Sequence, residues 1–115
     1  MARPYKLLLA LILFPSVCAA ASVDDEISFL LSSIDRDDCT FIRNDMSYSS
    51  SNFQDHLRSK LDANEQLISS AEDFIEKIAT RSAVSDSPYV AVCQGELRII
   101  KDWLAESLAS YRQSN

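Results

Sequence analysis

The chain has 115 residues, with 11 Lys and Arg against 17 Asp and Glu, so its formal net charge at pH 7 is −6. An acidic surface of this kind repels phosphate backbones, which argues against nucleic-acid binding. The length suits one domain with a modest core, and the single glycine leaves no glycine-rich phosphate loop.

The first 21 residues have the features of a secretory signal peptide. Two basic residues precede an apolar run at residues 7–14, and the small-residue segment PSVCAAA follows. Eight apolar residues form a helix of only about 12 Å, too short for a hydrocarbon layer of about 30 Å. We expect cleavage after Ala20 or Ala21, which leaves residues 22–115 as one small domain. Removing the two basic residues leaves 9 Lys and Arg against 17 Asp and Glu, a net charge of −8.

A bacterial lipoprotein signal is the competing interpretation, because it would acylate Cys18 at the same junction. That signal favours Gly, Ala or Ser immediately before the cysteine, and here the preceding residue is Val17. We therefore expect Cys18 to leave with the signal peptide. The mature protein is then secreted without a lipid or transmembrane anchor.

Helix-like and strand-like segments follow one another along the mature chain. Residues 22–35 carry an apolar stripe at 3–4 spacing with acids in the first turn, which predicts a helix. Residues 39–45, CTFIRND, predict a short strand. The serines at 49–51 are candidate N-caps for a second helix that continues through Leu61.

The second half of the chain also alternates helix-like and strand-like segments, without an internal repeat. It predicts a helix at 69–79, a strand at 88–93, a turn at 94–95, a candidate third strand at 97–99 and a last helix from about residue 100. Ser69 and Glu72 have the spacing of a capping box at the start of the third helix.

Two cysteines remain after signal-peptide removal, and an even number in an exported chain favours a disulfide. Cys39 begins the first predicted strand and Cys93 ends the second. Bonded cysteines have Cα atoms within about 7 Å, whereas parallel strands would hold these two about 15 Å apart. The bridge therefore favours antiparallel strands, and it stabilises the fold by roughly 4 kcal/mol on the loop-entropy estimate.

Pairing Cys39 with Cys93 also fixes the register of the two strands. On one side Phe41 faces Ala91 and Arg43 faces Tyr89; on the other side Thr40 faces Val92 and Ile42 faces Val90. We expect the second side, which is aliphatic, to be core-like.

Together these elements predict an α+β fold with about four helices packed on a small two- to three-stranded antiparallel sheet and one disulfide. Two cysteines and His56 are too few for a structural zinc site, so we expect no metal and no cofactor.

Several motifs occur in an order that resembles one family. They are CTFIRN at 39–44, Tyr48, HLRSK at 56–60, SAEDFIEKIA at 70–79, SPY at 87–89 and WL at 103–104. Over about residues 24–108 the chain is similar to the YfeK-like family of small exported bacterial proteins, a domain of unknown function. The resemblance implies a periplasmic setting in a Gram-negative bacterium and implies no activity. Asp45 and Asp86 stand where the family tends to have glycine, and Ile100 where a serine helix cap is common.

The polar residues that recur in this resemblance supply the candidate binding residues Arg43, Asn44, Tyr48, His56, Lys60 and Tyr89, together with Glu72 and Asp73. His56 and Lys60 lie one helical turn apart. We expect Arg43, Tyr48, His56 and Tyr89 to gather in one patch at the end of the sheet. Glu72 or Asp73 is the predicted anionic partner of Arg43, and we favour a structural lock over a ligand site for this arginine.

Three classes of function remain open. The first is an interaction or small-ligand-binding module for an unknown periplasmic protein or small ligand. The second is a structural or envelope-stress protein without a ligand. The third and least favoured is a small hydrolase with His56 as general base, because the chain offers one histidine and no placed nucleophile. Glu72 or Asp73 could orient a water for it, but acids at the start of a helix are better explained by capping, and we assign no catalytic residue.

Overall fold

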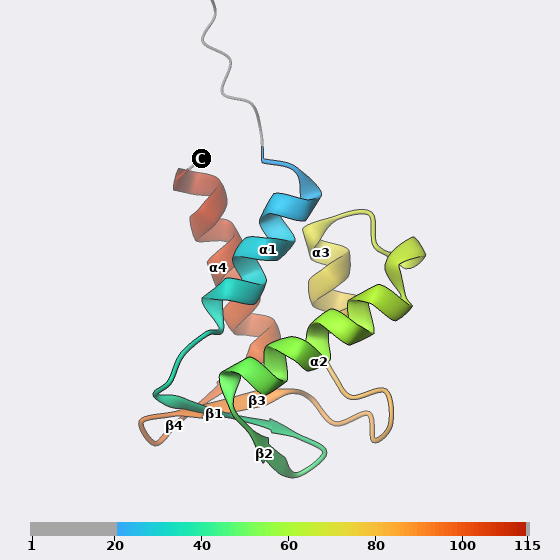
Figure 1. Ribbon diagram of the computed structural model, residues 1–115. Helices are drawn as coiled ribbons and strands as arrows, with labels where there is room; N and C mark the ends of the chain where they lie inside the picture. The colour runs from blue at the N-terminus through green and yellow to red at the C-terminus, as the bar shows by residue number, and fades with distance from the viewer. Residues whose placement is uncertain (1–20, 115) are drawn as a thin grey trace, which may run out of the picture.

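Four helices lie on one side of a small sheet in the computed structural model, which describes residues 21–114 (Figure 1). The elements are α1 (Val23–Ser33), β1 (Cys39–Arg43), β2 (Met46–Tyr48), α2 (Ser50–Ala63), the 3₁₀ turn η1 (Glu65–Leu67), α3 (Ala71–Asp73) with its π-helical continuation η2 (Phe74–Ile78), β3 (Val90–Cys93), β4 (Glu96–Ile99) and α4 (Ile100–Ser114). The α+β prediction is confirmed. The predicted apolar run of the signal peptide and Cys18 lie outside the described residues. Within residues 21–114, no helix is both long enough and apolar enough to cross a membrane.

The sheet has four strands in the order β2-β1-β3-β4, and all neighbours are antiparallel. The predicted register is confirmed for Cys39 with Cys93, Thr40 with Val92, Phe41 with Ala91 and Ile42 with Val90. The sequence predicts two or three strands, so β2 is an addition. Two-residue turns with positive φ join the strands of each hairpin, Asn44-Asp45 between β1 and β2 and Gln94-Gly95 between β3 and β4.

The predicted disulfide is confirmed between Cys39 and Cys93, whose Cα atoms lie 4.1 Å apart. These residues form the last pair of the β1–β3 ladder, at the end of the sheet away from Arg43. The bridge therefore closes a loop that contains β2, α2 and α3.

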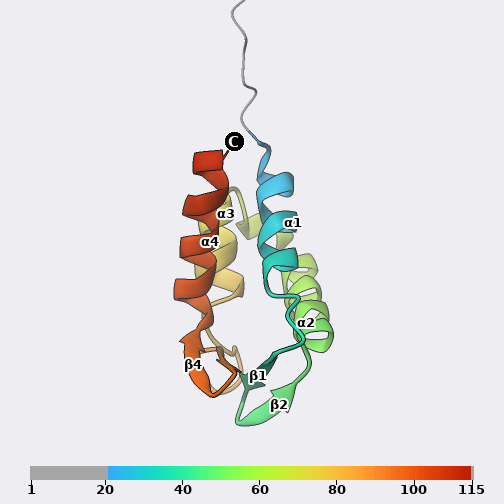
Figure 2. The ribbon, with the colours of Figure 1, turned by 90° about the vertical axis from the view of Figure 1, so that its left-hand side faces the viewer.

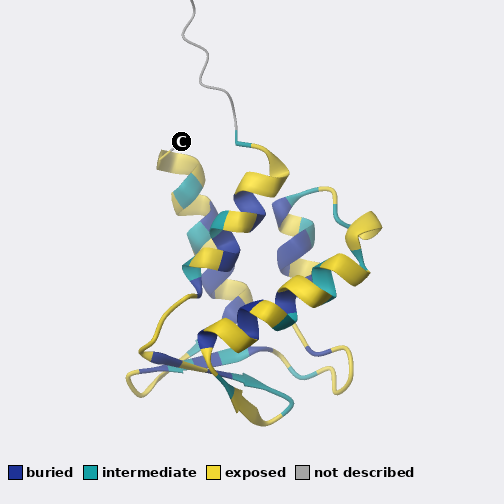
Figure 3. Ribbon diagram, in the orientation of Figure 1, coloured by how far each residue is buried: buried dark blue, intermediate teal, exposed yellow. Residues whose placement is uncertain are grey.

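The two faces of the sheet have the opposite roles from those expected. On the cysteine side Phe41 and Ala91 are fully buried, whereas on the other side Thr40 is exposed and Ile42 is only half-buried. Figure 3 shows buried segments of the helices on the side of the sheet that they cover. The aliphatic side is thus the outer face of the sheet. The reason is that all helices cover the side on which the aromatic ring of Phe41 can pack.

An aromatic column joins the sheet to the helices. The Phe41 ring lies 5.0 Å from Phe53 of α2 and 5.8 Å from Trp103 of α4, and Phe53 meets the edge of Tyr89 at 5.2 Å. Helices α1 and α4 lie side by side above the sheet (Figure 2). Phe29 of α1 stacks on Tyr111 near the C-terminal end of α4, with ring centroids 4.3 Å apart.

Serines begin three of the helices. Ser22 caps α1 in a capping box with Asp25, and Ser49 accepts from the Asn52 N–H at the start of α2. At the third helix the cap is Ser70, which accepts from the Asp73 N–H. The capping box predicted for Ser69 and Glu72 is therefore wrong by one position.

Candidate functional site

Five of the candidate residues meet where α2 crosses the sheet, and we call Arg43, Tyr48, His56, Lys60 and Tyr89 the basic cluster. The β1–β2 hairpin supplies the first two, α2 supplies His56 and Lys60 one turn apart, and Tyr89 immediately precedes β3. Phe53 and Leu57 direct the buried face of α2 toward the sheet, so His56 and Lys60 lie at the border of that face. The structure brings these residues together through contacts of Arg43 with Tyr48 and of His56 and Lys60 with Tyr89, and their role in binding stays a prediction.

The Tyr89 hydroxyl is the centre of the cluster. Tyr89 is only 1% exposed, and its hydroxyl lies 2.9 Å from Nε2 of His56 and 3.2 Å from Nζ of Lys60. An ammonium only donates, so the Tyr89 oxygen accepts from Lys60 and its own proton is directed to Nε2 of a neutral His56. Lys60 also donates to the Arg81 carbonyl at 2.7 Å.

Arg43 borders this group from the hairpin. Its Nη2 donates to the Tyr48 hydroxyl at 3.1 Å, and its guanidinium carbon lies 4.7 Å from the centre of the Tyr48 ring. Its Nε is buried and has no hydrogen-bond partner among residues 21–114. The guanidinium thus retains an unused donor on its buried side.

Burial and mutual repulsion shift the titration of the cluster. Burial lowers the pKa of the His56 imidazole below its ordinary value of 6.5, and the Arg43 and Lys60 charges lower it further. Burial also lowers the pKa of the Lys60 ammonium, with a second contribution from Arg43. Burial raises the pKa of the Tyr89 phenol, while the Arg43 charge opposes that shift. At neutral pH, His56 is therefore a neutral imidazole and Tyr89 a neutral phenol.

The predicted acidic partner of Arg43 is wrong. Glu72 instead receives two bonds from Arg112 of α4, at 2.6 and 3.1 Å, and Asp73 accepts from Ser69 and lies 3.6 Å from Lys77. These partners are local to α3 and α4, because α3 packs beside α4 and away from the hairpin. In the part of the chain that the structure describes, neither Arg43 nor Lys60 forms an ion pair.

Asn44, the sixth candidate, has a different contact. It adopts a left-handed φ of 54° in the hairpin turn, and its side-chain oxygen accepts from the Ser85 hydroxyl. The contact ties the hairpin to the loop before β3, which carries Tyr89. Asn44 therefore helps to fix the position of the loop that precedes Tyr89 relative to the β1–β2 hairpin. Ser85 and the Arg81 carbonyl were missed at the sequence level, since neither a loop serine nor a backbone oxygen gives a spacing signal.

The chemistry of the cluster is that of oxyanion recognition. Arg43 and Lys60 are positively charged hydrogen-bond donors. His56 would become a third charged donor if it were protonated. Among the described residues, the hydrogen-bond partner of the His56 ring is the Tyr89 hydroxyl and not a carboxylate. Across residues 21–114, no group of three His, Cys, Asp or Glu side chains is arranged to hold a metal ion.

Comparison with known proteins gives a family. Residues 21–112 match the family of unknown function DUF5329. Over 52 residues the chain is 38% identical to a protein of Salmonella typhimurium named uncharacterized protein YfeK, an alignment that covers 45% of this chain and 43% of that relative. No solved structure matches. Because the family match spans most of the chain and includes every residue of the basic cluster, the protein belongs to this YfeK-like family of unknown function.

Proposed function

We propose that this chain is an exported periplasmic protein that binds a small anionic ligand through the basic cluster. The observation that carries the proposal is the meeting of Arg43, Lys60 and His56 without a carboxylate partner among residues 21–114. In an acidic chain, cations are expected to pair with the abundant Asp and Glu side chains. A carboxylate or phosphate ligand would supply the missing negative charge.

The electrostatics of the cluster favour an anion in particular. Burial is the main cause of the lowered pKa of both His56 and Lys60, and the Arg43 charge lowers both further, so the three groups repel one another when all are charged. An anion among them relieves this repulsion and would accept charge-assisted hydrogen bonds from these cations. The rigid surroundings, with Tyr89 buried and Tyr48 stacked on the guanidinium, reduce the entropy cost of binding.

Export rests on other features. The apolar leader at residues 7–14 is short, the family match begins at residue 21, and the first helix is capped by Ser22 directly after the expected cleavage site. The Cys39–Cys93 disulfide is compatible with an oxidising compartment. Residues 22–115 are then the mature domain.

Anion binding is tested with inorganic phosphate and citrate as probes, by NMR titration at constant ionic strength. The matched variants are Arg43→Gln and Arg58→Gln, because Arg58 is an exposed arginine of α2 outside the cluster. We expect Arg43→Gln to weaken binding of at least one probe about tenfold or more, and Arg58→Gln to leave it unchanged. Absence of binding to either probe at about 10 mM, or equal losses in both variants, contradicts the proposal.

The pH dependence provides a second readout of the same site. His56 is neutral at neutral pH because its pKa is lowered, and a bound anion raises that pKa again. Phosphate and citrate also titrate between about pH 8 and 6, so the readout is the affinity of the unmodified protein relative to that of His56→Gln for the same probe. This ratio should increase as the pH falls, with uptake of a proton that the variant lacks, since Gln does not titrate.

A further inference from the structure

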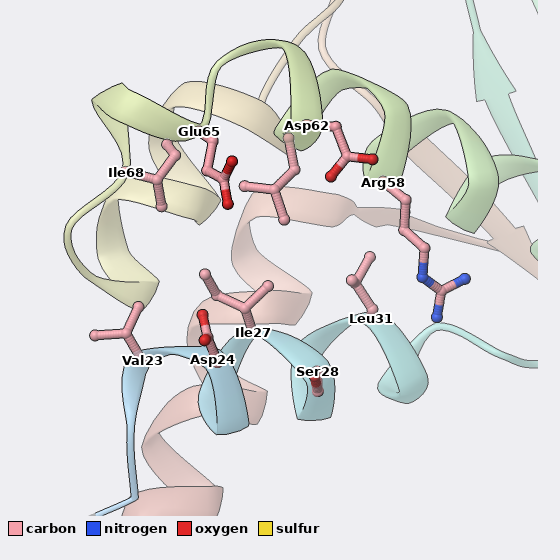
Figure 4. Close-up of a pocket in the computed structure, with 10 residues that line it drawn as sticks. Val23, Asp24, Ile27, Ser28, Leu31, Arg58, Asp62, Glu65 and Ile68 are labelled. Atoms are coloured by element: carbon pink, nitrogen blue, oxygen red, sulfur yellow. The ribbon is translucent and has the colours of Figure 1, made fainter.

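A hollow separates α1 from α2 and the η1 turn on a different side of the molecule. Its volume is about 280 Å³. Apolar side chains come from both walls: Ile27 and Leu31 from α1, Leu61 from α2, and Ile68 from the segment after η1. Figure 4 shows Ile27 and Ile68 pointing into the hollow from opposite sides. The hollow thus has an apolar part, and its size suits a small organic molecule.

Carboxylates surround this apolar lining. Asp24 comes from the first turn of α1, Asp62 from the last turn of α2 and Glu65 from η1. In Figure 4 the carboxylates of Asp24 and Glu65 are directed into the space between the two walls. None of the three forms an ion pair with a side chain of residues 21–114. Their charges therefore remain available to a ligand.

One cation, Arg58, lies at the end of the hollow. It is 3.8 Å from Asp55 on the same helix, and both side chains are largely exposed, so this pair is weak. The lining therefore contains three carboxylates and one guanidinium, so the net charge of the hollow is negative.

We propose that this hollow binds an amphipathic organic cation, an ammonium group carried on an apolar body of about six to ten carbons. The body would lie against Ile27, Leu31 and Ile68, while the ammonium would meet Asp24 and Glu65. Burial of the body against aliphatic side chains provides the driving force, and the carboxylates select the sign of the charge.

This site is separate from the basic cluster. Helix α2 contributes His56 and Lys60 to the cluster and Arg58 and Asp62 to the hollow. Two residues along a helix correspond to about 200° around its axis, so the two sets lie on different faces of α2. The two ligands have opposite charges, and the cation site stands or falls independently of the proposed anion site.

Three probes of equal length separate the alternatives: n-hexylammonium, hexanoate and 1-hexanol, followed by NMR at pH 7 on the whole exported protein. We expect hexylammonium to shift the methyl resonances of Ile27 and Ile68 and to bind about tenfold or more tightly than the other two probes. If 1-hexanol binds as tightly as hexylammonium, the hollow recognises only the apolar body. If hexanoate binds more tightly than hexylammonium, the hollow prefers the opposite charge. Either result overturns the proposal, as does the absence of any methyl shift with hexylammonium.

Matched variants test whether the carboxylates of the hollow cause the preference for hexylammonium. Asp24→Asn with Glu65→Gln should remove most of the preference for hexylammonium over hexanol, whereas Glu106→Gln on the exposed side of α4 should preserve it. Asp62→Asn supplies a second variant if the first loses helix stability, because Asp24 also lies in the first turn of α1. Magnesium should not displace hexylammonium, since a hydrated divalent ion gains nothing from the apolar lining. A preference unchanged in both charge variants contradicts the assignment.

Discussion

Asp45 and Asp86 both adopt a left-handed backbone conformation, with φ of 64° and 60°. Residues with a Cβ atom are strained there, and glycine is not. The family resemblance indicates glycine at these same two positions. This chain therefore tolerates local strain in the β1–β2 turn and in the loop before β3, the two segments that border the basic cluster.

We expect Asp45→Gly and Asp86→Gly each to raise the free energy of unfolding by about 0.5–1 kcal/mol. The surface contact of Asp86 with Arg81, at 3.7 Å, subtracts little from this gain. Asp55→Gly is the matched control, because Asp55 is an exposed residue inside α2, where glycine in place of aspartate should lower the free energy of unfolding by roughly 0.3 kcal/mol rather than raise it. Urea denaturation measures all three. A loss of stability in both turn variants would show that the aspartates make compensating contacts.

The strands show which parts of the fold are accessible from sequence. The positions of Cys39 and Cys93 were sufficient for the pairing and register of β1 and β3. Strand β2 was missed because three residues, Met46–Tyr48, are too few for a periodic pattern. Alternation of side chains separates two faces of a strand but does not say which face the helices cover, so the core face was assigned wrongly.

The same limit applies to the candidate site. The one-turn spacing of His56 and Lys60 is visible in the sequence, and the strand register placed Tyr89 opposite Arg43. The partner of Arg43 was not accessible, because the position of α3 depends on the packing of its buried residues. That packing brings Glu72 to Arg112, a residue 40 positions away in sequence.

The assignment of the sheet faces predicts different costs for apolar residues on β1 and β4. Phe41 is fully buried against Phe53 and Trp103, so Phe41→Ala should lower the free energy of unfolding by about 3–5 kcal/mol. Leu97 on the outer face is 63% exposed, so Leu97→Ser should change the free energy of unfolding by less than about 0.5 kcal/mol. Urea denaturation at low protein concentration compares the two. A large cost at Leu97 would mean that the outer face is covered in solution.

At the scale of the whole molecule, the disulfide and the basic cluster lie at opposite ends of the β1–β3 ladder. The bridge joins Cys39 to Cys93 at one end, and Arg43 and Tyr89 follow the ladder at the other. The long segment between the bridged cysteines includes α2, which carries His56 and Lys60. Closing this loop restricts the unfolded chain and so supports the arrangement of the cluster indirectly, through the stability of the domain.

Export and the disulfide can be tested together by the intact mass of protein isolated from the periplasm under non-reducing conditions. We expect a chain that begins at Ala21 or Ser22, without lipid, and lighter than its reduced form by the mass of two hydrogen atoms. Replacing both Cys39 and Cys93 by Ala should cost about 2–5 kcal/mol of stability, as in other small secreted domains. A mass that includes acyl chains on Cys18 would instead make the protein a membrane-anchored lipoprotein. Free thiols at Cys39 and Cys93 in freshly isolated material would contradict the oxidising compartment, and with it the proposed periplasmic ligand.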